Sequence, residues 1–335
     1  MNNEFWPSHT KDFIKLLGIE HPIIQAPMAG GPTTYELVAA VSNAGALGSF
    51  GAAYLSPEQI NSDIEKVKEL TNKPFCINLF TPEQEHATKV NKKVLEKLDE
   101  FSKELGVHNT IPPSASAFTF EDQLDVLIHN NVSVFSFTFG VPEQKYFKTL
   151  LDRGIKIIGT ATCVEEAVLL EKAGCTALVA QGSEAGGHRG TFESTSGLPM
   201  IGGLALIPQI VDKVNIPVIA SGGVMDGRGI AACLALGASA VQIGTAFLST
   251  KEAGVSQPWL EELKNTKDTS TVLTRSFTGK YARGIKNLFI DKMKDLENDV
   301  PPYPIQNRLT RKIRDASKQK GDSSYMSLWA GQGSA

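Results

Sequence analysis

Short apolar runs alternate with amphipathic stretches along most of the chain. Four apolar runs are "PIIQAP" (22–27), "FCINLF" (75–80), "SVFSFTFG" (133–140) and "PVIASGG" (217–223). Four more follow a helix-like stretch that ends at glycine, in "SNAGALGSFGA" (42–52), "LDRGIKIIGTAT" (151–162), "EKAGCTALVAQG" (171–182) and "LALGASAVQIGT" (234–245). A glycine helix cap followed by an apolar strand is typical of a parallel sheet that is buried on both faces.

The segments between these runs have the pattern of surface helices. Examples are "PEQINSDIEKVKEL" (57–70) and "CVEEAVLLEKAG" (163–174), in which apolar residues recur at helical spacing. Eight strands that alternate with helices predict an α/β protein with a (β/α)8 TIM barrel. We expect the barrel to comprise residues 12–80 and 121–250.

Two segments lie outside the predicted barrel. Residues 81–120 contain a charged helical run from about residue 83 to 105 and a Pro/Ser-rich link, "IPPSASAF" (111–118), and residues 251–335 follow the last predicted strand. We expect these two regions to form a smaller cap over one mouth of the barrel. The alternative is a surface excursion and a frayed tail.

Composition narrows the class of partner. Lys and Arg number 33 against 36 Asp and Glu, a net charge of −3, which disfavours nucleic acid and anionic membranes as partners. No segment resembles a secretion signal or a membrane span, so we expect a cytoplasmic protein with a small-molecule partner. The four cysteines form no CxxC motif, which predicts reduced thiols and no structural metal.

Polar and glycine-rich residues follow several of the predicted strands. In a barrel of this kind the carboxyl ends of the strands line the active site. His188 follows the sixth strand within "AQGSEAGGHRG" (180–190), where the glycines leave a histidine no core to fill. Gln25, Met28, Asn78 and Gln181 stand at other strand ends and are further candidates.

The loops after the seventh and eighth strands have the composition of a phosphate site. Gly222, Gly223, Gly244 and Thr245 would let backbone N–H groups approach phosphate oxygens without an intervening side chain. Barrels often bind a phosphate at these two loops. Glycine at a strand end is also ordinary turn chemistry, but the two loops together predict a phosphate site.

The ordered set of motifs resembles the class I nitronate monooxygenases, formerly called 2-nitropropane dioxygenases. The motifs are "PIIQAPMAGG", "INLF", "SFTFG", "AQGSEAGGHRG", "PVIASGGVMDGRG", "ALGASAVQIGTAF" and the closing "WAGQG". Each is a fragment, but their order over nearly the whole chain is specific. The resemblance implies an FMN enzyme on a barrel, in which His188 is the catalytic residue beside the flavin. The cofactor-binding residues would be Gln25, Met28, Asn78, Gln181, Gly186, Gly187, Gly222, Gly223, Gln242, Ile243, Gly244 and Thr245.

The resemblance also implies a reaction. Nitronates, including propionate 3-nitronate and alkyl nitronates, would be oxidised with O2 to a carbonyl compound and nitrite. His188 would either position the anionic substrate or act as a base on a neutral nitroalkane. Side-chain amides such as Asn78 and Gln181 suit the donor and acceptor edge of a flavin, although they also satisfy stray backbone groups. Monomer and homodimer both stay open.

Three residues near these motifs need comment. Thr138 stands in "SFTFG" where relatives often carry a second histidine, which changes how the far end of a substrate is held. Arg189 is either a carboxylate clamp or a loop anchor. Tyr303, in "PPYPIQN", is a candidate polar wall contributed by the C-terminal region.

Rival functions share the fold. An FMN-dependent enoyl-acyl-carrier-protein reductase has a similar "EAGGH" loop, and an NADH:quinone reductase is related. The chain has no GxGxxG between a strand and a helix, so no Rossmann nicotinamide site is expected. A flavin-binding module without turnover is the alternative from another class.

Overall fold

The computed structural model describes residues 6–82, 89–108, 118–193 and 197–335. Most of the predicted link 111–118, and the start of the charged run from residue 83, lie outside these ranges. The chain divides into two compact units. The first comprises Met1–Glu83, Ala117–Glu184 and Gly190–Gly254, and the second comprises Gln84–Ser116, Ala185–Arg189 and Val255–Ala335.

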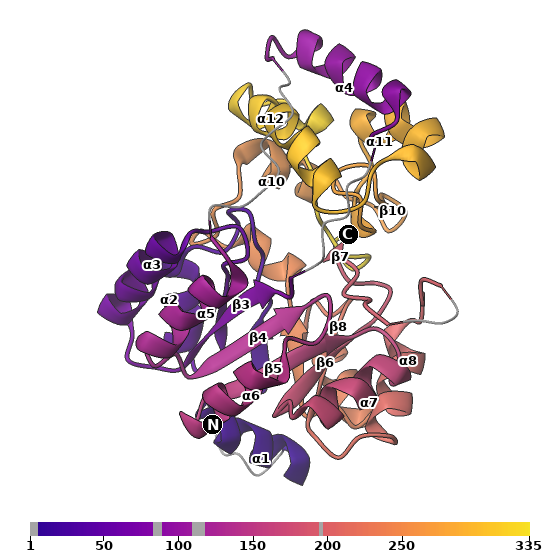
Figure 1. Cartoon of the computed structure of the whole chain (residues 1–335). Helices are drawn as coiled ribbons and strands as arrows, with labels where there is room; N and C mark the ends of the chain where they lie inside the picture. Colours follow the sequence, from indigo (N-terminus) through magenta and orange to yellow (C-terminus); the bar gives the residue numbers. More distant parts are fainter. Residues whose placement is uncertain (1–5, 83–88, 109–117, 194–196) are drawn as a thin grey trace. The chain divides into compact units, whose positions relative to one another are not determined.

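The first unit is a barrel of eight parallel strands, which confirms the predicted fold (Figure 1). Each predicted apolar run contains one strand, and the order around the sheet is β1-β9-β8-β6-β5-β4-β3-β2. The bridge between Ile24 and Leu47 joins the two edge strands. The strands are β1 (Ile23–Gln25), β2 (Gly48–Gly51), β3 (Phe75–Phe80), β4 (Val134–Thr138), β5 (Lys156–Ala161), β6 (Ala177–Gln181), β8 (Val218–Ser221) and β9 (Ala240–Ile243).

Helices between the strands cover the outside of the barrel. Local sequence signals fix their ends: α3 begins with a capping box between Ser56 and Gln59, and α7 ends at Gly174 with φ +98°. The buried face of α3 consists of Ile60, Ile64 and Val67, at the spacing of an amphipathic helix. The helices are α2 (Tyr35–Asn43), α3 (Pro57–Leu70), α5 (Phe120–His129), α6 (Gln144–Asp152), α7 (Val164–Ala173), α8 (Gly203–Val211) and α9 (Gly227–Ala235).

The N-terminal helix α1 (Ser8–Leu17) closes the end of the barrel where the strands begin (Figure 1). Its buried side chains Phe13, Ile14 and Leu17 share an apolar cluster with residues near the starts of the strands, among them Cys76 and Val134. This apolar plug makes the amino end of the barrel a structural face. The polar strand ends lie at the opposite, carboxyl end.

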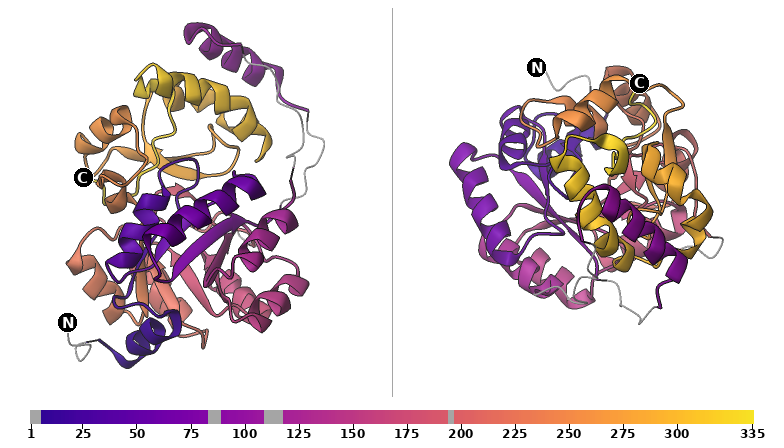
Figure 2. Two further views of the ribbon diagram at one scale, coloured as in Figure 1. Left: turned by 90° about the vertical axis from the view of Figure 1, so that its left-hand side faces the viewer. Right: turned by 90° about the horizontal axis from the view of Figure 1, so that it is seen from above.

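The second unit combines the insertion with the C-terminal region around one apolar core. Val94, Leu98 and Phe101 of α4 (Lys92–Glu104) share this core with Leu309 and Ile313 of α12 (Ile305–Gln319). Both views of Figure 2 and Figure 1 show these two helices side by side. Residues 255–335 are therefore folded and not a frayed tail. The unit also contains α10 (Gln257–Lys264), α11 (Leu288–Met293), and the short 3-10 helices η3 (Lys294–Asp299) and η4 (Ser323–Tyr325).

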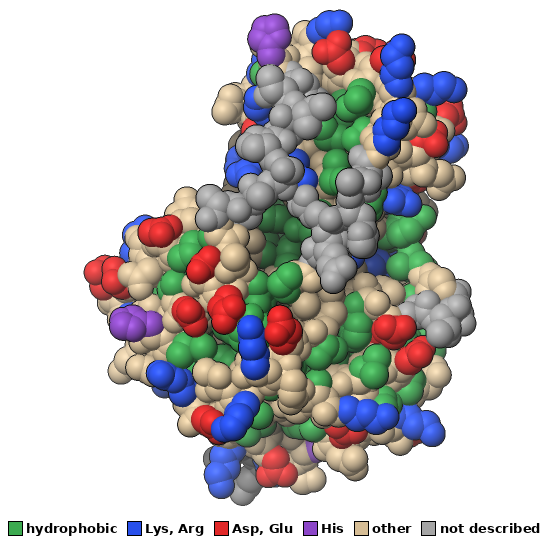
Figure 3. Space-filling model, in the orientation of Figure 1, with side chains coloured by type: hydrophobic (Ala, Val, Ile, Leu, Met, Phe, Trp, Pro, Cys, Tyr) green, Lys and Arg blue, Asp and Glu red, His purple; other side chains and the backbone are tan. Residues whose placement is uncertain are grey.

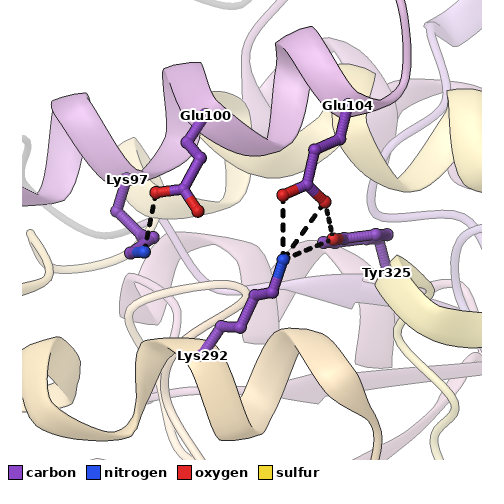
Figure 4. Close-up of polar contacts among 5 residues, drawn as sticks. All are labelled: Lys97, Glu100, Glu104, Lys292 and Tyr325. Atoms are coloured by element: carbon purple, nitrogen blue, oxygen red, sulfur yellow. Dashed lines mark hydrogen bonds and ion pairs between the residues drawn. The ribbon is translucent and has the colours of Figure 1, made fainter.

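A polar cluster attaches α4 to the C-terminal part of this unit (Figure 4). The Glu104 carboxylate lies 2.9 Å from Lys292 Nζ and accepts a hydrogen bond from the Tyr325 hydroxyl. The Tyr325 hydroxyl, and then Lys292, lower the pKa of Glu104. A second pair, Lys97 and Glu100, is 2.7 Å apart on the same helix. These surface contacts hold α4 against the C-terminal region, in addition to the apolar packing beneath them.

Both basic and acidic side chains are exposed on the face in Figure 3. Among the residues that the structure describes, no helix combines the length and the apolar character that a membrane crossing requires.

Candidate functional site

Two glycine loops emerge next to each other at the carboxyl end of the barrel. They follow β8 and β9, whose residues Ser221 and Gln242 pair in register. Gly222 and Gly223 have φ of 112° and 72°, a region that favours glycine. Gly244 precedes the 3-10 helix η2 (Thr245–Ser249), whose first turn no side chain caps. The two loops thus lie side by side where the sequence predicts a phosphate.

Met28, which follows the first strand, lies next to the glycine loop after β9. β1 pairs with β9, and Gln25 is in register with Ile243. A Cβ on Gly244 would lie 3.9 Å from Met28 Sδ, so the two residues are close neighbours. The Met28 loop is fixed by Thr33, whose hydroxyl accepts from Met28 N at 2.8 Å and donates to Met28 O at 3.0 Å.

The amide side chains at the strand ends already have protein partners. Gln25 is fully buried, and its Oε1 accepts from Ser49 N at 3.0 Å, across the seam between β1 and β2. Asn78 Nδ2 donates to Ser136 Oγ at 2.9 Å, and Gln181 Oε1 accepts from Gly190 N at 2.8 Å. Gln25 therefore helps to close the barrel. A side-chain amide has two donors and two acceptor sites, so the amide of Asn78 can form hydrogen bonds in addition to the one with Ser136.

The Glu184 carboxylate lies near the loops after β8 and β9, and its orientation decides whether these loops can hold an anionic cofactor. A Cβ on Gly223 would lie 3.3 Å from Glu184 Cβ. Glu184 accepts from Gly203 N, at 2.8 and 3.0 Å to its two oxygens, so its charge is directed to the amino end of α8. The exposed Gly223 backbone then fits a phosphate, and the amides at the neighbouring strand ends fit the polar edge of FMN.

His188 lies outside the barrel sheet. It belongs to β7 (Gly187–His188), which pairs antiparallel with β11 (Ala282–Ile285), and β11 pairs with β10 (Thr271–Thr274). The His188 ring is 5.6 Å from the Trp329 ring and 6.4 Å from the Tyr303 ring, between centroids. The expectation that this histidine has no core to fill is wrong. Residues distant in sequence supply the aromatic neighbours.

The surroundings of His188 favour its neutral form. His188 Nε2 lies 2.9 Å from Thr278 Oγ1. Burial, and then the positive charges of Lys280 and Arg314, lower the pKa of His188 to about 3. The ring is therefore an uncharged imidazole at neutral pH, although part of its surface stays accessible.

The glycines before His188 have different roles. A Cβ on Gly186 would lie 2.5 Å from Gly331 N, so the closing "WAGQG" segment needs a glycine there. Gly187 has φ +73°, and a Cβ added to it would have no atom within 4 Å, so only its backbone conformation favours glycine. Arg189 is 2% exposed and its N–H donates to Tyr281 O at 2.8 Å, which favours the loop-anchor interpretation.

The chain after His188 is attached to the barrel at several points. A Cβ on Gly190 would lie 2.8 Å from Thr160 Cγ2 and 3.3 Å from Thr138 Cγ2, which places Thr138 against this return. The buried Glu166 carboxylate accepts from Phe192 N at 2.6 Å and from Glu193 N at 3.0 Å. Residues 190–193 are thus anchored within the barrel unit.

Sequence reasoning missed several neighbours of His188. Thr278, Lys280 and Arg314 follow it by ninety or more positions and belong to no motif. Trp329 lies in the closing motif "WAGQG", but no role beside His188 was predicted for it. No local pattern could have indicated the others, because β-pairing and helix packing bring them together.

Comparison with known proteins gives a consistent picture. The family model described as nitronate monooxygenase matches residues 11–335. Probable nitronate monooxygenases from Staphylococcus saprophyticus and Staphylococcus aureus are each 46% identical over 320 residues, covering 95% of this chain and 90% of the relative.

Solved structures are also similar. Nitroalkane oxidase from Streptomyces ansochromogenes has a TM-score of 0.90 and 38% identity, covering 98% of this chain and 92% of its own. FabK from Thermotoga maritima has a TM-score of 0.75 and 30% identity, covering 96% of this chain and 89% of its own.

Proposed function

We propose, since this chain belongs to the nitronate monooxygenase family, that it uses FMN and O2 to convert nitronates to a carbonyl compound and nitrite. The enzyme is an oxidoreductase, as its family is. The finer parts of the proposal are the cofactor, the substrates and the roles of the site residues.

The pair of glycine loops after β8 and β9 is the observation that carries the proposal. Gly222, Gly223, Gly244 and Thr245 would hold the single phosphate of FMN through their backbone N–H groups. Asn78 and Gln181 would direct the flavin ring with their amides. Bound FMN supplies the electron acceptor that protein side chains lack. Met28 would contact the cofactor from the first strand.

Charge around His188 supports an anionic substrate. The Lys280 and Arg314 charges that depress the pKa of His188 also attract a nitronate. Propionate 3-nitronate carries a second negative group, so both of its charges would be attracted by Lys280 and Arg314. Alkyl nitronates carry one negative charge and are expected to bind more weakly. The neutral His188 ring would contact the substrate without adding a third positive charge.

Two measurements test this proposal. Mass spectrometry of the released cofactor should give FMN, since the loops offer one phosphate site. FAD would contradict it. Nitrite release should then be measured with nitronates matched in length, with and without a carboxylate. The carboxylate-bearing substrate should have the higher kcat/KM, and absence of nitrite with every nitronate would refute the activity.

The enoyl-acyl-carrier-protein reductase is the second candidate, and the similarity to FabK favours it. This alternative has less support than the nitronate activity, because FabK has the smaller TM-score and identity of the two structures compared. An NADH:quinone reductase is a related alternative. Either reductase requires oxidation of NADH or NADPH by the purified protein, so stopped-flow mixing with both nucleotides separates them from a nitronate oxidase. Membership of an oxidoreductase family disfavours a binding module without turnover.

A further inference from the structure

Glu166 is a fully buried carboxylate at the carboxyl end of the barrel, in the first turn of α7. Its Oε2 accepts from Thr162 N at 2.5 Å and from the Thr162 hydroxyl at 2.8 Å. Its Oε1 accepts from Phe192 N at 2.6 Å and from Glu193 N at 3.0 Å. Both oxygens therefore have two donors each, as a carboxylate removed from water requires.

These donors come from two separate segments of the barrel unit. Thr162 directly follows β5, whereas Phe192 and Glu193 lie where the chain returns from β7. A third contact joins the same segments, because Thr162 Oγ1 lies 2.8 Å from Thr191 Oγ1. The Thr162 hydroxyl has one proton and donates it to Glu166, so Thr191 is the donor in this contact. Glu166 thus fastens the returning chain to the end of β5.

The returning chain begins at Gly190, which contacts Gln181. Gly190 N donates to Gln181 Oε1 at 2.8 Å. A Cβ on Gly190 would lie 2.8 Å from Thr160 Cγ2, so the backbone packs closely against β5 at this point. Gly190 is only two residues before Phe192, whose N–H the carboxylate of Glu166 holds. The backbone donor to Gln181 therefore has little freedom to move while Glu166 keeps its bonds.

We propose that Glu166 is a positioning residue, which acts through Gly190 to set the place of the Gln181 amide. This rests on the proposed function, in which Gln181 directs the flavin ring. Removal of the carboxylate should then weaken FMN binding without any contact between Glu166 and FMN. Glu166→Gln keeps the size of the side chain. It replaces one acceptor oxygen by an NH2 group, which would face two donors and could not bind them.

Hydrogen exchange resolved to single amides tests the first part of the proposal, independently of FMN. The amides of Gly190, Phe192 and Glu193 should exchange faster in Glu166→Gln than in wild type, because their acceptors are lost or displaced. Ser42→Ala is the control. Ser42 is 1% exposed, and its hydroxyl donates to Pro74 O at 2.9 Å, just before β3 at the other end of the barrel. This control should leave exchange at Gly190 unchanged.

The affinity of the full-length apoprotein for FMN is the second readout. Glu166→Gln should raise the Kd about twofold to tenfold, the range for one hydrogen bond, as measured by quenching of flavin fluorescence. Gln181→Met removes the amide and keeps a side chain of similar length. If Glu166 acts through Gln181, adding Glu166→Gln to Gln181→Met should change the Kd by less than about twofold.

Two results would overturn the proposal. One is unchanged exchange at Gly190 in Glu166→Gln. The other is an equal rise in Kd with and without the Gln181 amide, which would mean that Glu166 acts only through the stability of the fold. Glu166→Asp, which keeps the carboxylate and shortens its reach, replaces Glu166→Gln if that variant does not fold. If the wild type binds no FMN, the proposed function fails instead, and exchange at Gly190 still decides whether Glu166 holds the partner of Gln181.

Discussion

The two units of this chain present their candidate functional residues in different ways. In the barrel, residues such as Gly223 and Gly244 follow strands directly, and the order of the strands places them together. In the second unit, His188 is surrounded by Thr278, Tyr303 and Trp329, which come from separate parts of the C-terminal region. The residues of the barrel site could therefore be predicted from local sequence patterns. The surroundings of His188 depend instead on contacts between residues that are far apart in the sequence.

The segment 185–189 explains much of this difference. It leaves the barrel after β6 and joins a sheet of the second unit as β7. A loop that belongs to one unit by sequence thus belongs to the other by contacts. The following predictions separate what each unit contributes.

Removal of the imidazole should have the largest effect. His188→Asn should retain the barrel-bound FMN but lose about 10²- to 10⁴-fold in kcat/KM on neutral nitroalkanes, the range for loss of a general base. The loss on preformed nitronates should be smaller. Steady-state kinetics with both substrates and the flavin absorbance of the purified variant check this. Equal losses on both substrates would assign His188 to anion positioning, and full activity on both would make it scaffolding.

The barrel contribution is tested by Gly223→Val. A side chain there would intrude on the backbone that we propose to hold the phosphate, so the variant should purify with most of its FMN missing while remaining folded. Gly154→Val is the matched control, because Gly154 has a similar φ of +74° with no atom within 4 Å of an added Cβ, and it precedes β5 at the other end of the barrel. Both variants should lose about 1–3 kcal/mol of stability from backbone strain. Equal FMN content in the two would move the phosphate elsewhere.

The contact between the histidine loop and the closing motif is tested by Gly186→Ala. Its Cβ would lie 2.5 Å from Gly331 N and 2.6 Å from Ala330 C, so the backbone must shift, at a cost of about 1–3 kcal/mol. Gly187→Ala has only the φ of +73° to overcome. Urea unfolding should rank Gly186→Ala as the less stable variant. The reverse order would show that the two segments are not in close contact.

Acid should destabilise the second unit through His188. The pKa of His188 is about 3 when folded and near 6.5 when unfolded, so between these values the unfolded chain binds a proton that the folded chain does not. Stability is therefore unaffected above pH 6.5 and falls as pH decreases toward 3. Urea unfolding from about pH 7 to about pH 4 should show a shallower decline for His188→Asn than for wild type. Parallel declines would contradict the depressed pKa.

The smallest expected effect concerns the polar cluster on α4. Glu104→Gln should cost about 0.2–1 kcal/mol, since exposed ion pairs contribute little. Because the folded pKa of Glu104 is lowered, its contribution is present at neutral pH and is lost as pH falls below the ordinary range of a glutamate. Glu96→Gln is the control on the same helix, where the pair with Lys92 is more exposed. Thermal unfolding of both variants should show a measurable change only for Glu104→Gln.

The sequence predicted the barrel well because each strand carries its own signal. Apolar runs bounded by glycine or polar residues recur along the barrel, and Gly222 and Gly223 could be placed at strand ends by counting. The contact between Thr278 and His188 could not be predicted, because it depends on how β10, β11 and α12 pack together. Gln25 was placed correctly at a strand end, but only the hydrogen bond to Ser49 shows its part in closing the barrel.

Anaerobic mixing with a nitronate tests the central claim most directly. The claim is that this chain is an FMN enzyme that accepts electrons from nitronates. Propionate 3-nitronate, mixed with the purified yellow protein without O2, should bleach the flavin absorbance, and NADH should leave it unchanged. Bleaching by NADH and not by the nitronate would contradict the account and assign the protein to the reductases.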